Sequence, residues 1–194
     1  MARTASTMLP LQTPAPSFSL PDVVSGSEVR LGDFADARGL LVMFISVHCP
    51  YVQHVATALA DLGRDYAPSG LGIVAISAND IAAYPQDAPE HLQKMARDLG
   101  FVFPVLYDES QAVAKAYTAA CTPDFFLFDA QQRLVYRGQL DDSRPGSDTP
   151  VTGADLRTSI DALLAGDPID EAGQKPSMGC NVKWKPGNEP DYFL

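Results

Sequence analysis

The sequence predicts a single α/β domain in which helices pack against a β-sheet. Short apolar runs typical of buried strands, at residues 40–45, 73–76 and 125–128, alternate with longer stretches of helical periodicity. The chain has 194 residues, of which 46% are hydrophobic and 20% charged, enough to bury one substantial core. No internal repeat divides it, so we expect one domain.

The first elements predicted are a tail and a hairpin. Residues 1–12 carry no periodic pattern and are expected to form a flexible N-terminal tail. Residues 17–20 alternate as an edge strand does, and residues 25–27 have the composition of a turn. Val29 and Leu31 then alternate on the second strand of the hairpin.

A strand–helix–strand unit follows. The continuous apolar run at residues 40–45 predicts a central strand, and Pro50 suits the first turn of the helix after it. The apolar residues of that helix share one face: Val52, Val55, Leu59, Leu62 and Tyr66. Residues 73–76 form the next buried strand, so the connection should be right-handed.

Another helix and an edge strand come next. Asp87 resembles the capping residue at the start of a helix. The apolar face of this helix is Leu92, Met95 and Leu99, and Gly100 ends it. Residues 101–107 predict a strand, which Pro104 places at an edge or a bulge.

The last regular elements are a short helix, a hairpin and a final helix. Asp108 or Ser110 starts the short helix, and residues 125–128 and 134–136 form the hairpin. Thr152 can cap the final helix, which Gly166 ends. The domain therefore spans residues 13–166, and residues 167–194, with four prolines and three glycines, form an irregular C-terminal tail expected to pack on it.

Composition excludes several functions. The chain has 24 acidic and 14 basic residues, a net charge of −10, which disfavours binding to nucleic acid. No apolar stretch is long enough to span a membrane, and residues 1–12 lack the order of a signal peptide, so we expect a cytoplasmic protein. Three cysteines, Cys49, Cys121 and Cys180, are too few for a disulfide-rich secreted fold.

Cys49 is the strongest candidate for chemistry. It lies directly after a buried strand and before Pro50, where the first backbone N–H groups of a helix and its dipole stabilise an anion. A thiol there is expected to ionise at about pH 3.5 to 7.5 instead of near 8.5. The alternative is a buried structural thiol, since cysteine is often buried and inert.

Three segments resemble the thioredoxin-like redoxins, and within them the alkyl hydroperoxide reductase/thiol-specific antioxidant branch. They are His-Cys-Pro-Tyr-Val at residues 48–52, Cys-Thr-Pro-Asp at 121–124 and Gly-Cys-Asn-Val-Lys-Trp at 179–184. The resemblance implies a thioredoxin-like fold with a central mixed sheet, Cys49 as the attacking sulfur, and a cis peptide at Thr122–Pro123 facing it.

The sequence departs from the better-known relatives at two motifs. Val52 stands where thioredoxins carry their second cysteine, so Cys49 is a monothiol centre. Ser46 matches the serine or threonine of the peroxiredoxin motif, whereas Val42 replaces its proline. Arg137 and Arg144 are candidates, by residue type alone, for the arginine that orients peroxide. These departures weaken the case for efficient peroxidase activity.

A resolving thiol for Cys49 must come from elsewhere. Cys180 lies on the tail, Cys121 lies two residues before Pro123, and an external thiol is the third candidate, in that order of preference. Alternatively, Trp184 anchors a docked tail in which Cys180 is idle, and Cys121 is part of the core.

Two histidines flank Cys49. We expect His48 to tune or shield the thiolate, and His54 to be a surface or hydrogen-bonded residue. A zinc site would need four ligands from these histidines and cysteines, and no metal or organic cofactor is expected.

The sequence thus predicts a thiol-dependent oxidoreductase with antioxidant, weakly peroxidase-like potential. Its predicted substrates are disulfides or peroxides, its reductant an external thiol or thioredoxin-type protein, and its state a monomer or homodimer. The alternatives are a non-catalytic binding module for a metal, haem or protein partner, and a redox sensor.

Overall fold

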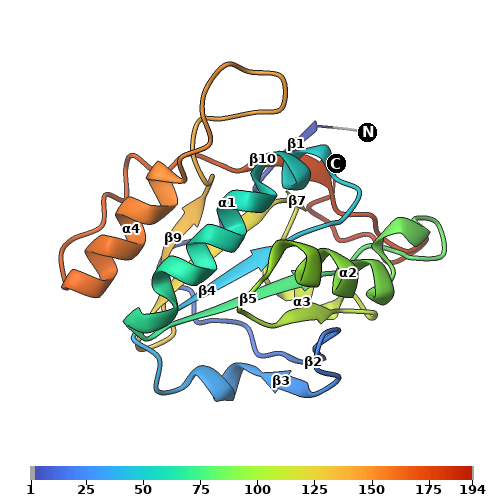
Figure 1. Cartoon of the computed structure of the whole chain (residues 1–194), viewed down its shortest axis with the longest axis horizontal. Coiled ribbons are helices and arrows are strands. Elements are labelled where there is room, and N and C mark those ends of the chain that lie inside the picture. Colours follow the sequence, from blue (N-terminus) through green and yellow to red (C-terminus); the bar gives the residue numbers. More distant parts are fainter. Residues whose placement is uncertain (1–2, 194) are drawn as a thin grey trace.

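The computed structural model describes residues 3–193, in which a mixed five-stranded sheet forms the centre (Figure 1). The strand order is β6-β5-β4-β8-β9. Strands β4 (Gly39–Phe44), β5 (Leu71–Ser77) and β6 (Val105–Tyr107) are parallel, and β8 (Asp124–Asp129) and β9 (Leu134–Gly138) are antiparallel to their neighbours. The predicted apolar run at residues 40–45 is therefore confirmed as the central strand.

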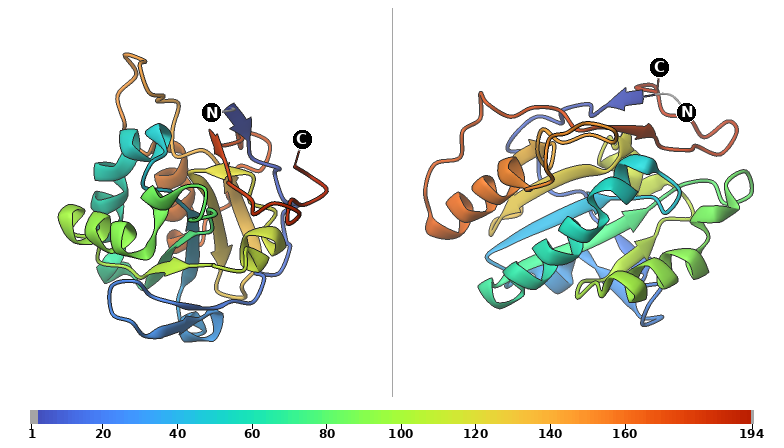
Figure 2. Two further views of the ribbon diagram at one scale, coloured as in Figure 1. Left: turned by 90° about the vertical axis from the view of Figure 1, so that its right-hand side faces the viewer. Right: turned by 45° about the horizontal axis from the view of Figure 1, so that its top comes forward.

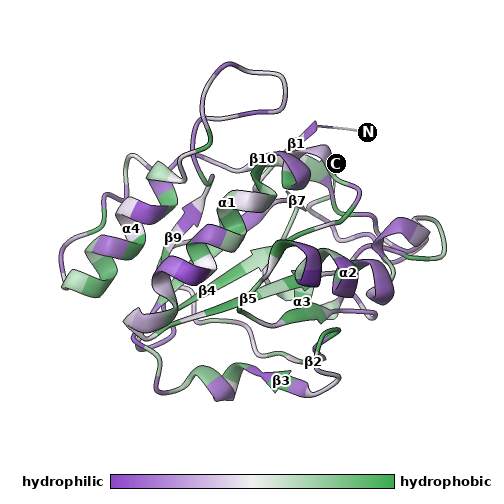
Figure 3. Cartoon of the chain, in the orientation of Figure 1, coloured by the Kyte–Doolittle hydropathy of each residue, from purple (hydrophilic) through white to green (hydrophobic). Residues whose placement is uncertain are grey.

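Helices cover both faces of this sheet (Figure 2). Helices α1 (Pro50–Tyr66), α2 (Pro89–Leu99) and α4 (Ala154–Ala165) pack on one face, and α3 (Ala112–Ala116) packs on the other with the C-terminal tail. Because β4 is buried on both faces, all six of its residues are inaccessible and apolar or glycine. Figure 3 shows the contrast with α1, whose apolar and polar residues alternate around the helix.

The predicted hairpin and helix ends are found with small shifts. Strands β2 (Ser19–Pro21) and β3 (Glu28–Arg30) form the hairpin, and α1 has its apolar face buried as predicted. Gly100 and Gly166 end α2 and α4 in the left-handed conformation. Three short 3₁₀ helices lie at Leu31–Phe34, Ala67–Ser69 and Pro85–Asp87.

Four predictions of local structure in the domain need correction. The residue preceding α4 is Gly153, and no side chain caps that helix, so Thr152 is not its cap. The strand expected at residues 101–107 is only β6, because Pro104 lies just outside it. The residue preceding α2 is Ala88, and no side chain caps that helix, so Asp87 is not its cap. The short helix is preceded by Gln111 instead of starting at Asp108 or Ser110.

The N-terminal tail, expected to lack regular structure, contains strand β1 (Arg3–Ala5). It pairs with β10 (Met178–Asn181), which also pairs with β7 (Cys121–Thr122), giving the sheet order β1-β10-β7. The two ends of the chain thus meet near the N-terminus of α1 (Figures 1 and 2). Beyond β10 the C-terminal tail packs on the domain, with Trp184 buried as an anchor. Within residues 3–193, no helix has both the length and the hydropathy to cross a membrane.

Candidate active site

Cys49 lies at the N-cap of α1, as the sequence predicts. Its backbone is extended, with φ −74° and ψ 119°, and Pro50 begins the helix. The thiol donates a hydrogen bond of 3.1 Å to the carbonyl oxygen of Thr122. Thr122–Pro123 is a cis peptide, as the family resemblance implied. Through this hydrogen bond, Cys49 is in direct contact with the residue before the cis proline.

The Cys49 side chain is completely buried, with 0% of its surface exposed. The sequence analysis named burial only as the alternative, because β10, which packs against α1 and β7, lies far away in the sequence. Any reagent that reaches Cys49 must therefore displace part of this cover.

Cys180 is the cysteine that the fold places against Cys49. It lies on β10 opposite Thr122, whose carbonyl oxygen accepts the hydrogen bond from Cys49. Burial, together with the hydrogen bond and charge of Cys49, raises the pKa of Cys180 to about 12. The two sulfurs thus lie close enough to interact directly.

Cys121 is placed differently. It pairs with Asn181, so strand alternation directs its side chain to the opposite face of the small sheet from Thr122 and Cys180. Its thiol donates to the carbonyl oxygen of Pro123 at 3.6 Å. Burial, together with the charges of Asp124, Cys49 and Cys180, raises the pKa of Cys121 well above its usual value. These features fit the alternative in which Cys121 is a core residue.

A buried carboxylate organises the loop that precedes Cys49. Asp87 is 0% exposed and accepts hydrogen bonds from Ser46 Oγ (3.0 Å), Val47 N (2.6 Å), His48 N (3.3 Å) and Asn79 Nδ2 (2.6 Å). His48 Nδ1 lies 2.6 Å from the same carboxylate. Asp87 thus holds residues 46–48, directly before Cys49, through its hydrogen bonds.

Within this network, His48 and Ser46 take specific places. The His48 ring stacks on Tyr84, with 5.4 Å between ring centroids, and its buried Nε2 has no hydrogen-bond partner among residues 3–193. The Asp87 carboxylate thus fixes the orientation of the imidazole ring through Nδ1. Ser46, the residue that matched the peroxiredoxin motif, directs its hydroxyl to Asp87.

The same network holds the segment that follows Cys180. Asn79 Oδ1 accepts a hydrogen bond of 2.8 Å from the Lys183 backbone N–H. The amide of Gln111 donates to the Lys183 carbonyl oxygen at 2.9 Å, and its oxygen accepts from Lys185 N at 2.9 Å. Asn79 therefore connects both cysteine-bearing segments through side-chain hydrogen bonds.

Sequence reasoning missed Asp87, Asn79, Gln111 and Lys183 as site residues. Asn79 could have been predicted, because Ser46 and Asn79 follow the parallel strands β4 and β5, whose carboxyl ends meet at one edge of the sheet. The other three lie on connections whose approach to Cys49 has no local sequence signature.

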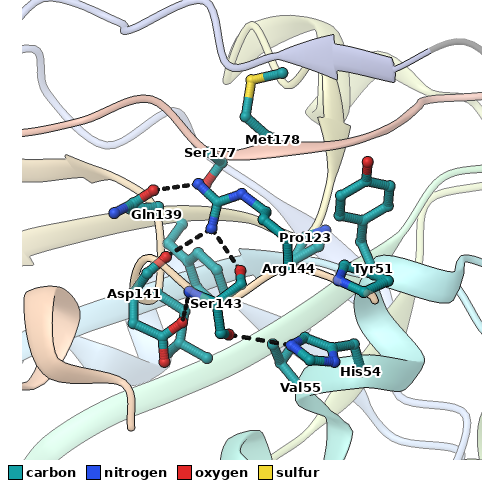
Figure 4. A pocket seen from close by; sticks show the side chains of 13 residues that line it. Tyr51, His54, Val55, Pro123, Gln139, Asp141, Ser143, Arg144, Ser177 and Met178 are labelled. Carbon is teal, nitrogen blue, oxygen red and sulfur yellow. Dashed lines mark hydrogen bonds between the residues drawn. The ribbon is translucent and has the colours of Figure 1, made fainter. Parts of the chain in front are cut away.

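A small pocket lies beside the cis proline, between the start of α1, the loop at residues 139–145 and β10 (Figure 4). Arg144 lines it, but its guanidinium is bonded to the Gln139 side chain and to the carbonyl oxygens of Asp141 and Ser143. Among residues 3–193, no hydrogen bond joins Arg144 to Cys49, and Arg137 bonds to the carbonyl oxygen of Leu9 and to the Gln174 side chain. His54 is hydrogen-bonded to Ser143 at 3.2 Å, as expected for a satisfied residue.

Among residues 3–193, no three His, Cys, Asp or Glu side chains are grouped as the ligands of a metal ion would be. His48 and His54 point into different networks, one with Asp87 and the other with Ser143. The flanking histidines therefore do not converge on a common ion with Cys49.

Comparisons with known proteins find sequences and folds similar to those of this chain. The model of the AhpC/TSA family matches residues 11–137. Thiol-disulfide oxidoreductase ResA of Geobacillus kaustophilus is 28% identical over 126 residues, which are 65% of this chain and 67% of ResA.

Solved structures extend the similarity over nearly the whole chain. An uncharacterized conserved protein from Geobacillus kaustophilus is 53% identical with a TM-score of 0.93, covering 96% of this chain and 98% of its own. A hypothetical protein, SMc02350 from Sinorhizobium meliloti 1021, is 49% identical with a TM-score of 0.91, covering 94% and 98%. The thioredoxin domain of a thiol-disulfide oxidoreductase from Bacteroides vulgatus, 19% identical with a TM-score of 0.63 over 80% of this chain and 99% of that one, has the same fold. The thioredoxin-like fold is thereby confirmed.

Proposed function

Because the chain belongs to the AhpC/TSA family and holds two thiols in contact at the start of α1, we propose that Cys49 and Cys180 are the redox pair of a thiol–disulfide oxidoreductase. The observation that carries this proposal is the position of Cys180, opposite Thr122 and against the sulfur at the helix N-terminus. The similarity to ResA supports the same class of reaction.

The reaction has two exchange steps. The Cys49 thiolate attacks one sulfur of a substrate disulfide, forming a mixed disulfide and releasing the first substrate thiolate. The Cys180 thiolate then attacks the Cys49 sulfur, forming the Cys49–Cys180 disulfide and releasing the second thiolate. The two cysteines lose two electrons, the substrate gains them, and the protons of the two thiols pass to the released thiolates or to water.

Access to Cys49 requires β10 to move. Both sulfurs are covered in the reduced protein, with 0% of Cys49 and 3% of Cys180 exposed. Strand β10 is short and lies between β1 and β7, so its local opening exposes both thiols together. We expect this opening to limit the rate at which large disulfides react.

Several observations favour disulfides over peroxides as oxidants. Ser46 is bonded to Asp87, Arg144 is bonded within its own loop, and no arginine is hydrogen-bonded at Cys49 among residues 3–193. Peroxide reduction would form a sulfenic acid on Cys49 that Cys180 resolves, with release of water. We expect it to be the slower reaction.

The test follows the thiolates released from an aromatic disulfide, 5,5′-dithiobis(2-nitrobenzoic acid), together with mass spectrometry. Unmodified protein should release two thiolates in succession and gain an internal Cys49–Cys180 disulfide. Cys180→Ser should release one and retain the adduct on Cys49, whereas Cys121→Ser should behave as the unmodified protein. An adduct found first on Cys121 or Cys180, or an internal disulfide containing Cys121, would refute the assignment.

The binding-module alternative predicts different behaviour in the same samples. A protein that only binds a partner at this site would leave Cys49 unmodified at pH 7 by the disulfide and by iodoacetamide alike. A working redox pair should react with both, and prior oxidation should protect Cys49 from iodoacetamide.

A further inference from the structure

Lys183 is a buried cation beside the redox pair. Only 6% of its surface is exposed, although lysine is almost never buried without a partner. Its ammonium group donates to the backbone oxygen of Asn181 (3.0 Å) and to the Asn181 side-chain oxygen (2.6 Å). It also lies 5.6 Å from the centroid of the Tyr84 ring. All these contacts are with neutral groups.

No ion pair found among residues 3–193 includes Lys183. The charged or titratable groups that interact with it electrostatically are Cys180 on β10, Cys49 at the start of α1 and Asp87 in the 3₁₀ turn before α2. Burial lowers the pKa of Lys183, and these three groups oppose that effect. Asp87 is already engaged by His48 and Asn79. The negative charge still to be formed near Lys183 is therefore a thiolate.

The backbone holds Lys183 in this position. Its N–H donates to Asn79, and its carbonyl oxygen accepts from Gln111 and from Asp80 N (2.8 Å). Since these three residues belong to the domain, they anchor the backbone of Lys183, three residues after Cys180, and the bonds to Asn181 hold its ammonium group next to β10.

We propose that Lys183 is a positioning residue for the second exchange step, in which its ammonium group stabilises the Cys180 thiolate that attacks the mixed disulfide on Cys49. This inference rests on the proposed redox pair. A cation is needed at this position because burial opposes ionisation of the Cys180 thiol. An adjacent positive charge favours the charged form of a thiol.

The experiment separates the two thiolate releases from 5,5′-dithiobis(2-nitrobenzoic acid) by stopped flow between pH 6 and 10. Lys183→Met and Lys183→Gln should slow the second release at pH 7 by about tenfold and move its pH midpoint up by about one unit. Lys183→Arg, which keeps the charge, should restore both. Lys94→Met is the matched control, because Lys94 is an exposed lysine that pairs with Asp98 on the same helix.

The pH midpoint distinguishes charge from packing. A variant that merely loosened β10 would change the second release by the same factor at every pH, without moving the midpoint. An unchanged midpoint in both neutral variants would overturn the role of Lys183 and leave the redox pair intact. Absence of a second release from the unmodified protein would instead refute the redox pair itself, and with it this inference.

Discussion

At the scale of single residues, Asp87 is the group on which the shape of the site depends most. It is 0% exposed and is the common acceptor for the loop before Cys49 and for Asn79. A buried carboxylate is tolerated only when its oxygens are hydrogen-bonded or paired. Here several donors from the loop and His48 satisfy it.

Replacing Asp87 should destabilise the fold and the site together. Asp87→Ala leaves the N–H groups of Val47 and His48 and the amide of Asn79 buried without their acceptor. We expect the free energy of unfolding in urea to fall by about 3 to 5 kcal/mol. Asp61→Ala, which removes an exposed carboxylate paired with Arg64, should change it by less than about 1 kcal/mol. Equal effects of the two substitutions would contradict this account.

Asp124, directly after the cis proline, is a second buried carboxyl group. Burial raises its pKa to about 7, against the opposing hydrogen bonds from Ser6 and from backbone N–H groups. In the part of the chain that the structure describes, its Oδ1 has no hydrogen-bond partner. The folded state therefore keeps a proton on Asp124 in a pH range where the unfolded chain has lost it.

This difference makes the stability pH-dependent. Because the folded pKa exceeds the unfolded value of 3.8, Asp124 makes the folded state less stable as pH rises from about 4 to about 7, and the loss is complete above pH 7. The slope is at most about 1.4 kcal/mol per pH unit. Asp124→Asn should remove this contribution, so its stability relative to the unmodified protein should increase between pH 5 and pH 8 in urea unfolding. A difference that does not vary with pH, as expected for the exposed control Asp98→Asn, would show that Asp124 is not the source.

At the scale of elements, β10 brings Cys180 to Cys49 because Gly179 allows its backbone to lie against β7. A Cβ atom at Gly179 would be 2.0 Å from the carbonyl oxygen of Thr122, which is far inside van der Waals contact. The atoms it would meet belong to backbone, so they cannot rotate away. Only glycine permits this spacing.

Gly179→Ala should therefore move β10 away from β7 and separate the two sulfurs. We expect at least a tenfold slower second thiolate release and a smaller yield of the Cys49–Cys180 disulfide, with overpacking costing about 1 to 3 kcal/mol of stability. Gly32→Ala is the control, since a Cβ atom there meets no atom within 4 Å. If Gly179→Ala formed the disulfide as fast as Gly32→Ala, the close approach would not be what aligns the cysteines.

At the scale of the whole molecule, the Cys49–Cys180 disulfide would join α1 to the C-terminal tail. It would close a loop of about 130 residues, and cross-linking so long a loop removes conformational freedom mainly from the unfolded chain. The chain-entropy model gives about 4 to 5 kcal/mol for loops of this length.

Oxidised protein should consequently unfold at a higher temperature than reduced protein. For a chain of this size the expected rise in Tm is on the order of 10 °C, measured by calorimetry with and without a reductant. Cys180→Ser should show the same Tm in both conditions. An oxidised protein no more stable than reduced protein would mean that the disulfide forms only with distortion of the native packing around β10.

The sequence by itself determined the parts of this protein that depend on local patterns. The central strand at β4, the full extent of α1 and the place of Cys49 at their junction all follow from apolar periodicity and from Pro50. The hairpins and the glycine-terminated helices follow from turn and cap chemistry. These features depend on neighbours a few residues away, so the local sequence is enough to predict them.

Only the tertiary structure decided how the site is completed. The register of β10 against β7 places Cys180, and not Cys121, on the face that meets Cys49, and the pairing of β1 with β10 orders a segment that has no pattern of its own. The sequence suggests Asp87 as a helix cap, whereas the structure shows it accepting hydrogen bonds from the loop at Val47, about 40 residues earlier. Lys183 is held at the site by a hydrogen bond to Asn79, about 100 residues away in the chain. Strand pairing and buried polar networks join segments distant in sequence, and no local propensity specifies which distant donor will meet which acceptor.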